Sequence, residues 1–285
     1  MQRLNARVIV ALVIALGGLF SYLGTRSVNE ITGDVQHVSL SPAQEIALGL
    51  EAAPSMSQQY GGELDRPEVA RYVAGVGERI VARSDAARTP YRYGFHVLAD
   101  RETVNAFALP GGQVFITAGL LSRLSNEAEL AGVLGHEVGH VVARHGAEHL
   151  AKQQFSQTLV GAFGVAVYDA SHPRSSQEAA AVAAAVAQLA DLRYGREDEL
   201  EADALGVRFM RAAGYDCAGM IELMKVLAGL GGARQPEFFS THPNPENRLA
   251  RIQEEIEKAG ARGGERGEAA FRDHVLGALP GPGRR

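Results

Sequence analysis

The apolar positions near the start of the chain form one unbroken run. Val8–Gly24 is seventeen residues long without a charge, and Arg3 and Arg7 precede it. Such a run reaches the short limit for a helix that spans a bilayer. Because the arginines come before the run and a long domain follows, that domain is expected outside the cytoplasm. We predict a single-pass anchor in a bacterial inner membrane with a periplasmic domain. The alternative is a cleaved signal peptide and a soluble periplasmic protein, although no clear cleavage site follows.

In the middle of the chain the apolar positions recur every three or four residues. The segment from Asn126 to about Leu150 carries such a stripe, made up of Leu130, Val133, Leu134, Val138, Val141 and Val142. This periodicity predicts one buried helix over the whole range. Asn126, followed three residues later by Glu129, resembles the capping box that begins many helices.

Short runs of β-branched and aromatic residues predict a small sheet upstream of this helix. Phe95–Ala99 and Gln113–Thr117 are predicted as strands, with Asn105–Leu109 as a short strand between them that ends in the turn Pro110–Gly112. Further helices are expected over 42–53, 66–83, 195–210 and 246–258. The expected fold class is therefore α+β and mainly helical, with a small sheet beside the helix that begins at Asn126.

Composition limits the classes of function. A hydrophobic content of 46% and a formal net charge of -5 fit a soluble globular enzyme and argue against a protein that binds nucleic acid. Cys217 is the only cysteine, so the chain forms no internal disulfide and cannot build a cysteine-based zinc site. About 260 residues follow the first apolar run, which suffices for one large hydrophobic core.

The predicted central helix contains a sequence with chemical meaning. His136-Glu137-Val138-Gly139-His140 reads HExxH. Residues four apart share one face of a helix, so His136 and His140 can reach the same metal ion. Glu137 lies beside them, where its carboxylate can take a proton from the attacking water. This is the layout of a zinc metallopeptidase.

A rival motif follows on the same predicted helix. His145-Gly146-Ala147-Glu148-His149 spells HxxEH, the reversed zinc signature of another metallopeptidase class. On one continuous helix, His145 is rotated about 180° from His136. We therefore expect His145 and His149 to face away from the HExxH histidines, on a solvated terminal turn.

Catalytic zinc usually has three protein ligands, and an acidic helix downstream offers the third. Glu199 and Asp203 are four residues apart and share a face. Glu199 can bind zinc while Asp203 accepts a hydrogen bond from a liganding imidazole. Glu201 points about 200° away from Glu199 and is not expected at the metal.

Three segments together resemble the membrane-associated gluzincins, the family of the HtpX, Oma-type and CAAX prenyl protease relatives and the periplasmic BepA-like protease-chaperones. They are Gly135–His145, Tyr194–Asp203, and Thr241-His242-Pro243 followed by Arg248. The resemblance covers about residues 40 to 258. It implies the gluzincin fold and one zinc ion per chain. The implied roles are metal ligands for His136, His140 and Glu199, the catalytic carboxylate for Glu137, and orientation of a ligand for Asp203.

The resemblance also gives roles to residues outside the helices. It implies that His242 reaches the zinc site, where it either stabilises the developing oxyanion or fills the open coordination position in a resting state. Arg248 is expected to anchor the loop of His242 through an ion pair. Gluzincins bind extended peptides against a sheet edge, so the candidate substrate-binding residues are Asn105, Ala106, Phe107 and Ala108.

The expected function is that of a zinc endopeptidase acting on unfolded or misassembled cell-envelope proteins, with extended polypeptides as substrates, the membrane as a partner and envelope assembly complexes as further candidate partners. The alternative is a chaperone-like envelope quality-control factor with a zinc site that is structural or blocked by His242. The intact Glu137 favours the peptidase, because a binding module has no need of it. A cytosolic peptide-trimming enzyme is disfavoured by the N-terminal apolar run.

The domain boundaries follow from these assignments. We expect an anchor or signal segment at 1–26, a linker and first helix at 27–61, the metallopeptidase domain at 62–258, and a disordered tail at 259–285 that contains at most one helix, at Glu268–Leu279. Two further segments, Phe155–Tyr168 and Ser176–Leu192, are expected as helices that roof the cleft as a lid, joined by a loop at Asp169–Ser175.

Overall fold

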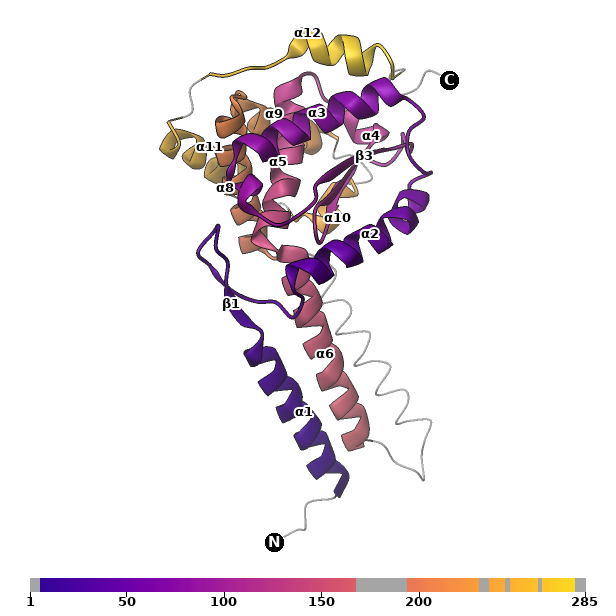
Figure 1. The fold of residues 1–285 in the computed structure, drawn as a ribbon, viewed down its shortest axis with the longest axis vertical. Coiled ribbons are helices and arrows are strands. Elements are labelled where there is room, and N and C mark those ends of the chain that lie inside the picture. Colours follow the sequence, from indigo (N-terminus) through magenta and orange to yellow (C-terminus); the bar gives the residue numbers. More distant parts are fainter. Residues whose placement is uncertain (1–5, 168–193, 231–235, 244–246, 261–262, 280–285) are drawn as a thin grey trace. The chain divides into compact units, whose positions relative to one another are not determined.

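The computed structural model describes residues 6–167, 194–230, 236–243, 247–260 and 263–279 (Figure 1). The chain divides into two compact units. One comprises Met1–Leu40 and Ala147–Tyr194, and the other comprises Ser41–Gly146 and Gly195–Arg285. The HExxH sequence and the acidic helix downstream belong to the second unit.

The first unit is built around the N-terminal helix α1 (Ala6–Gly24). A short antiparallel hairpin of β1 (Arg26–Val28) and β2 (Val35–His37) follows it. Most of the long helix α6 (His145–Val167) also belongs to this unit. Within the described part of the chain, α1 is the one helix that is long and apolar enough to cross a membrane, judged by length and composition.

Of the segment expected as the first lid helix, residues 155–167 form the second half of α6, and they pack against α1. The ring of Phe155 stacks on Tyr22 of α1 with ring centroids 4.9 Å apart. Thr158 lies so close to Gly18 that a Cβ added to this glycine would meet its methyl group at 2.6 Å. The other two parts of the expected lid, Asp169–Ser175 and Ser176–Leu192, lie outside the described residues.

The second unit has a three-stranded sheet and a set of helices packed around α5 (Glu127–Ala143). The sheet order is β3-β5-β4, with β3 (Gly94–Leu98) parallel and β4 (Ala106–Leu109) antiparallel to the central β5 (Gln113–Thr117). The helices are α2 (Pro42–Gln59), α3 (Pro67–Arg83), η1 (Asp85–Arg88), α4 (Ala118–Leu121), α8 (Arg196–Ala213), α9 (Ala218–Gly229), α10 (Phe238–Thr241), α11 (Arg248–Lys258) and α12 (Glu268–Phe271). The predicted α+β, mainly helical class is confirmed.

Helix α5 forms the centre of this unit, and all its residues are buried. It begins as its sequence predicts, because the side chain of Asn126 accepts a hydrogen bond from the main-chain N–H of Glu129 at 2.9 Å. It packs against α3, α8, α9 and the edge strand β4. Glycines allow α8 to approach closely: a Cβ on Gly139 would lie 2.9 Å from the carbonyl oxygen of Ala202, and one on Gly206 would lie 3.1 Å from the amide nitrogen of His136.

The single helix expected from Asn126 to Leu150 is wrong, because the chain turns at Arg144. This residue has φ 61° and ψ 26°, the left-handed conformation that ends α5, and α6 starts at the next residue. Such a backbone costs about 1–2 kcal/mol for a residue with a Cβ. The guanidinium compensates by pairing with the buried carboxylate of Glu45 on α2, with Nε 3.0 Å from Oε1. The sequence rules for helix ends expect glycine or asparagine in the left-handed conformation, so they do not predict a helix end at an arginine.

The one helix expected within the C-terminal tail, at Glu268–Leu279, is present. Helix α12 continues into a π-helical turn over Arg272–Leu276, and the side chains of Phe271, Val275 and Leu279 are buried. These three residues are four apart, so they line one face, and Phe271 contacts the ring of Tyr72 on α3.

Candidate metal centre

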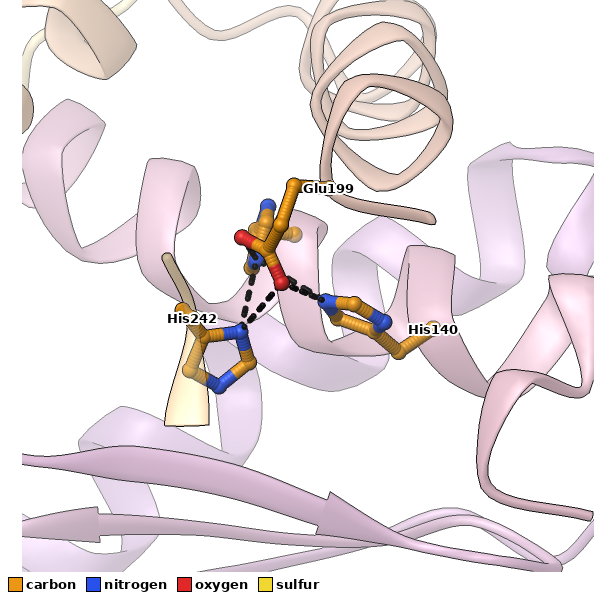
Figure 2. Close-up of side chains that lie close together, drawn as sticks. His140, Glu199 and His242 are labelled. Carbon is orange, nitrogen blue, oxygen red and sulfur yellow. Dashed lines mark hydrogen bonds and ion pairs between the residues drawn. The ribbon is translucent and has the colours of Figure 1, made fainter. Parts of the chain in front are cut away.

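Four side chains converge inside the second unit. His136 and His140 come from α5, Glu199 comes from α8, and His242 caps the C-terminal end of α10 (Figure 2). All four are buried, and one possible ligand atom from each lies within 4.8 Å of the others. The structure thus brings together the three predicted zinc ligands and adds the imidazole of His242 to them.

The spacing of these atoms is close to that of four ligands around one metal ion. Zinc bonds of about 2.0–2.2 Å hold the ligand atoms of a tetrahedron roughly 3.3–3.6 Å apart. The Nε2 atom of His136 lies 3.0 Å from Nε2 of His140, 3.3 Å from Nδ1 of His242 and 3.6 Å from Oε2 of Glu199. Oε1 of Glu199 lies 3.5 Å from Nε2 of His140 and 3.0 Å from Nδ1 of His242. Three imidazole nitrogens and one carboxylate oxygen form a donor set that suits zinc.

A buried ion-pair network holds the side of the site that faces α8 and α11. Oδ1 of Asp203 lies 2.9 Å from Nδ1 of His136, the nitrogen opposite the one that faces the cluster. Arg248 donates to both oxygens of Asp203, at 2.7 and 2.9 Å, and its Nη1 lies 2.9 Å from Oε2 of Glu199. Burial alone would raise the pKa values of Asp203 and Glu199, but both are lowered. Arg248 and His136 lower the pKa of Asp203, and the neighbouring imidazoles of His140 and His242 lower that of Glu199.

Glu137 is completely buried next to the cluster. Among the described residues neither of its carboxylate oxygens has a hydrogen-bond partner, and Oε1 lies 3.6 Å from Nε2 of His242. Burial raises the pKa of Glu137 above its ordinary value. Buried carboxylates without partners are costly, so one beside a candidate metal site points to a ligand or water that it serves.

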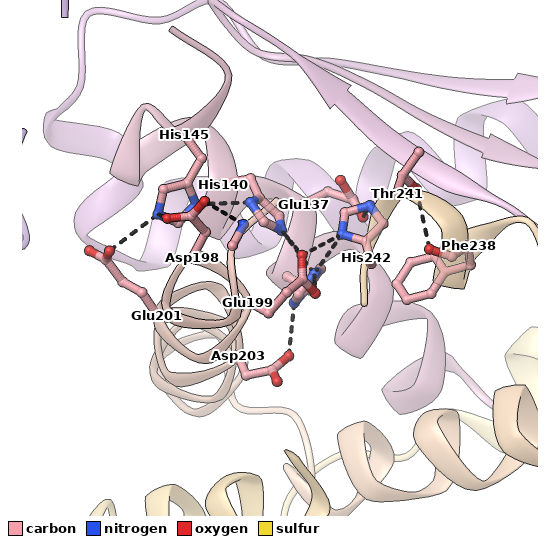
Figure 3. Close-up of polar contacts among 12 residues, drawn as sticks. Glu137, His140, His145, Asp198, Glu199, Glu201, Asp203, Phe238, Thr241 and His242 are labelled. Atoms are coloured by element: carbon pink, nitrogen blue, oxygen red, sulfur yellow. Dashed lines mark hydrogen bonds and ion pairs between the residues drawn. The ribbon is translucent and has the colours of Figure 1, made fainter. Parts of the chain in front are cut away.

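The structure contradicts the expectation that His145 points away from the HExxH histidines. Because the helix breaks at Arg144, His145 turns back and its Nδ1 lies 2.9 Å from Nδ1 of His140 (Figure 3). Its Nε2 lies 3.2 Å from Oε2 of Glu201. His145 is 3% exposed, which excludes the solvated terminal turn that we expected.

The predicted substrate strand β4 is an edge strand, but its residues differ in role. Among the described residues no strand pairs with β4 on the side away from β5. Asn105 is buried; its N–H donates to the hydroxyl of Thr117 and its C=O accepts from the N–H of that residue. Main-chain groups alternate in direction along a strand, so those of Phe107 also face β5, whereas those of Ala106 and Ala108 face the free edge.

The side chain of Asn105 supports the segment that carries His242. It donates to the hydroxyl of Tyr60 at 3.2 Å and to the carboxylate of Glu237 at 3.1 Å. Tyr60 itself donates to Glu237 at 2.6 Å, and its burial raises the pKa of its hydroxyl to about 12. Asn105 therefore connects the sheet to the start of α10, a role that its position in the sequence did not indicate.

The comparison with known families decides what kind of site this is. Residues 67–256, more than half of the chain, match the model of Peptidase family M48. The chain belongs to peptidase family M48. This membership confirms the resemblance drawn from the three sequence segments.

The M48 relatives include proteins of bacteria and of mitochondria. The chain is 32% identical over 216 residues to the beta-barrel assembly-enhancing protease of Yersinia pestis, a match that covers 74% of this chain and 44% of that protein. It is 34% identical over 152 residues to the mitochondrial metalloendopeptidase OMA1 of Arabidopsis thaliana, covering 53% of this chain and 29% of that protein. With the metalloprotease YcaL of Escherichia coli it shares 29% identity over 224 residues, covering 78% and 80%. The chain thus spans less than half the length of the beta-barrel assembly-enhancing protease that it matches.

Proposed function

We propose that this chain is a zinc-dependent endopeptidase with a gluzincin fold that hydrolyses peptide bonds of unfolded or misassembled cell-envelope proteins. The observation that carries the proposal is the convergence of His136, His140, Glu199 and His242, with one possible ligand atom from each within 4.8 Å of the others, beside the buried carboxylate of Glu137. Membership of family M48 supports the peptidase activity.

Each side chain of the site has a part in this reaction. Zinc held by His136, His140 and Glu199 would supply a Lewis acid that polarises water and the scissile carbonyl. Glu137 accepts a proton from the attacking water and passes it to the leaving amine, a task that suits a carboxylate with a raised pKa. Asp203 holds the ring of His136 in the tautomer that leaves Nε2 free for metal.

His242 would be the fourth ligand of a metal ion held by His136, His140 and Glu199. Its Nδ1 lies 3.3 Å from Nε2 of His136 and 3.0 Å from Oε1 of Glu199, close to the spacing of ligands around one metal ion. A catalytic zinc site keeps one position open for water, so His242 has to leave before hydrolysis begins. We therefore assign this arrangement to a resting state. The same observation favours a second candidate function, a chaperone-like factor with a permanently blocked site.

Substrates of this enzyme are extended polypeptides that pair with the edge of β4. The main-chain groups of Ala106 and Ala108 point to the free edge, which allows two residues of this strand to hydrogen-bond a peptide. Pairing through the main chain selects extended backbone with little regard to side chains, which suits unfolded proteins. The relatives named beta-barrel assembly-enhancing protease support substrates in the cell envelope and envelope assembly complexes as partners.

The location of the enzyme follows from the first unit. We assign α1 to a membrane anchor that leaves the catalytic unit in the periplasm. Helix α6 runs antiparallel to α1, because Gly18 meets Thr158 whereas Tyr22, further along α1, meets the earlier residue Phe155. The part of α6 after Thr158 therefore runs beside the part of α1 before Gly18. It carries no charge, so it lies in the bilayer with α1.

The test compares three forms of the full-length chain in detergent or nanodiscs: wild type, Glu137→Gln and His242→Ala. Zinc content and cleavage of an unfolded protein such as casein are measured for each. We expect about one zinc per chain in all three, cleavage by wild type, and at least ~100-fold slower cleavage by Glu137→Gln, which cannot take the proton. A well-folded wild type without zinc contradicts the metal site, and near-normal cleavage by Glu137→Gln contradicts the mechanism.

The His242→Ala variant separates the two candidate functions. If His242 only occupies the open position at rest, its loss leaves cleavage intact or increases it. Zinc in all forms, with cleavage by His242→Ala and none by wild type, shows that His242 blocks the site, as the chaperone-like candidate requires. Zinc without cleavage in any form points to a structural zinc site, the other form of that candidate.

A further inference from the structure

His145 reaches the metal centre only because the helix that carries HExxH is interrupted. Five residues after His140, a continuous helix would have placed its side chain about 140° around the axis. The left-handed backbone of Arg144 instead turns the chain so that the imidazoles of His140 and His145 meet, with ring centroids 4.9 Å apart. Both residues belong to the same compact unit, and both rings are buried.

The hydrogen bonds of the two rings fix which nitrogen of each carries a proton. Nε2 of His140 faces the metal cluster, so its proton resides on Nδ1. That Nδ1 lies 2.9 Å from Nδ1 of His145, which must then be an unprotonated acceptor. The proton of a neutral His145 therefore sits on Nε2, which lies 3.2 Å from a carboxylate oxygen of Glu201. Each donor in this chain of contacts faces an acceptor.

The acidic first turns of α8 supply the charges that face His145. Besides Glu201, Oδ1 of Asp198 lies 3.9 Å from Nε2 of His145, and its other oxygen accepts from the main-chain N–H of Gly195 at 2.9 Å. The same helix carries Glu199 to the metal position. Through His145, which contacts His140, Glu201 links the end of the HExxH helix to the acidic helix at a second point, separate from the ion pairs of Asp203 and Arg248.

We propose that His145 and Glu201 are positioning residues that hold the ring of His140 for metal binding, as Asp203 holds the ring of His136. His140 donates from Nδ1 to His145, and His145 donates from Nε2 to Glu201. This inference rests on the proposed zinc site. It accounts for a buried imidazole that the catalytic roles leave unused, and for the partly exposed carboxylate that it contacts. Removal of a hydrogen-bond partner of a metal-ligating side chain lowers metal affinity, although the partner does not touch the metal.

The test measures zinc affinity by competition with a chromophoric chelator, for the full-length protein and three variants. His145→Leu removes the acceptor, whereas His145→Asn keeps one, because the Oδ1 of asparagine occupies nearly the place of Nδ1. We expect His145→Leu to weaken zinc binding by about 10- to 100-fold. His145→Asn should keep most of the affinity. His149→Leu, the same change at the other histidine of HxxEH, should leave it unchanged.

A spectroscopic signature separates positioning from simple packing. Nitrogen-15 NMR of the zinc-loaded protein labelled at histidine reports the tautomer of each ring, and His145→Asn identifies the signals of His145. We expect the ring of His145 to be protonated on Nε2 alone. In the zinc-affinity measurement, Glu201→Gln keeps an acceptor oxygen and should bind zinc more tightly than Glu201→Leu.

Three outcomes overturn the inference: His145 protonated on Nδ1, His145→Leu with wild-type affinity for zinc, or His145→Asn as weak as His145→Leu in a folded protein. If wild type itself binds no zinc, the proposed function fails instead. Circular dichroism of each variant shows whether it is folded.

Discussion

Arg248 and Asp203 are joined by two hydrogen bonds of 2.7 and 2.9 Å in the interior of the protein, and through them α11 is tied to the metal centre. Both side chains are buried, at 1% and 2% exposure. Asp203 also contacts His136, and Arg248 also pairs with Glu199. One guanidinium therefore balances two carboxylates, one of which is a candidate metal ligand.

Replacement of Arg248 by methionine should strongly destabilise the zinc-free protein. It leaves Asp203 and Glu199 buried without their cation, and breaking a buried pair in this way costs about 3–5 kcal/mol. Urea unfolding of the zinc-free protein measures the loss. Arg251→Met is the matched control on the same helix, because the side chain of Arg251 is 57% exposed and its pair with Glu254 is worth about 0–1 kcal/mol. Equal stability of the two variants contradicts the role of Arg248.

The Arg248–Asp203 pair also predicts a dependence of stability on pH. The pKa of Asp203 is lowered in the folded protein, chiefly by Arg248 against the effect of burial. Its contribution to stability is therefore fully present above the ordinary aspartate pKa of about 3.9 and is lost as the pH falls below that value. Acid unfolding of the zinc-free protein checks this. The decline in stability below that pH should be shallower in Asp203→Asn than in wild type.

Gly139→Ala should separate α5 from α8 and weaken the metal site. A Cβ at this position would lie 2.9 Å from the carbonyl oxygen of Ala202 and 3.2 Å from its Cα. Both are main-chain atoms of α8, so the helix itself would have to shift. We expect a loss of about 1–3 kcal/mol in stability, as in other overpacked cores, together with weaker zinc binding because α8 carries Glu199. Gly75→Ala on α3 is the control: a Cβ there meets nothing within 4 Å, so stability should rise by about 0.5–1 kcal/mol.

Phe271→Ala tests whether the segment after α11 belongs to the folded unit. The ring is fully buried and contacts Tyr72, so its removal should cost about 3–5 kcal/mol in the free energy of unfolding. Arg272→Ala should change little, because the side chain of Arg272 is 68% exposed. Differential scanning calorimetry of both variants gives the answer. A disordered tail would make the two substitutions indistinguishable.

Phe163→Cys examines the proposed position of α6 in the membrane. Phe163 is 49% exposed on the half of the helix that runs beside α1, whereas the side chain of Lys152, nearer the start of α6, is 45% exposed. In nanodiscs, a membrane-impermeant maleimide should label Lys152→Cys and spare Phe163→Cys. The native Cys217 is buried and gives little background. Similar labelling at both positions places this half of α6 in water.

The sequence by itself determined the features that depend on local spacing. Residues four apart share a helix face, so His136 with His140, and Glu199 with Asp203, were identified from the order of residues alone. Alternation and turn residues likewise located the strands around Phe107. These features depend only on how side-chain direction repeats along a helix or a strand, and that period can be read from the order of residues.

The tertiary structure decided what depends on a break in that repeat or on contacts between distant segments. A single helix across Arg144 would place the side chain of His145 away from the metal site. In the structure Arg144 has a left-handed backbone, which its ion pair with Glu45 of α2 stabilises, and the turn there brings His145 beside His140. Likewise, the buried stripe that contains Phe271 has meaning only once α3 lies against it. A partner about a hundred residues away sets the local backbone at Arg144, so no local pattern could have revealed it.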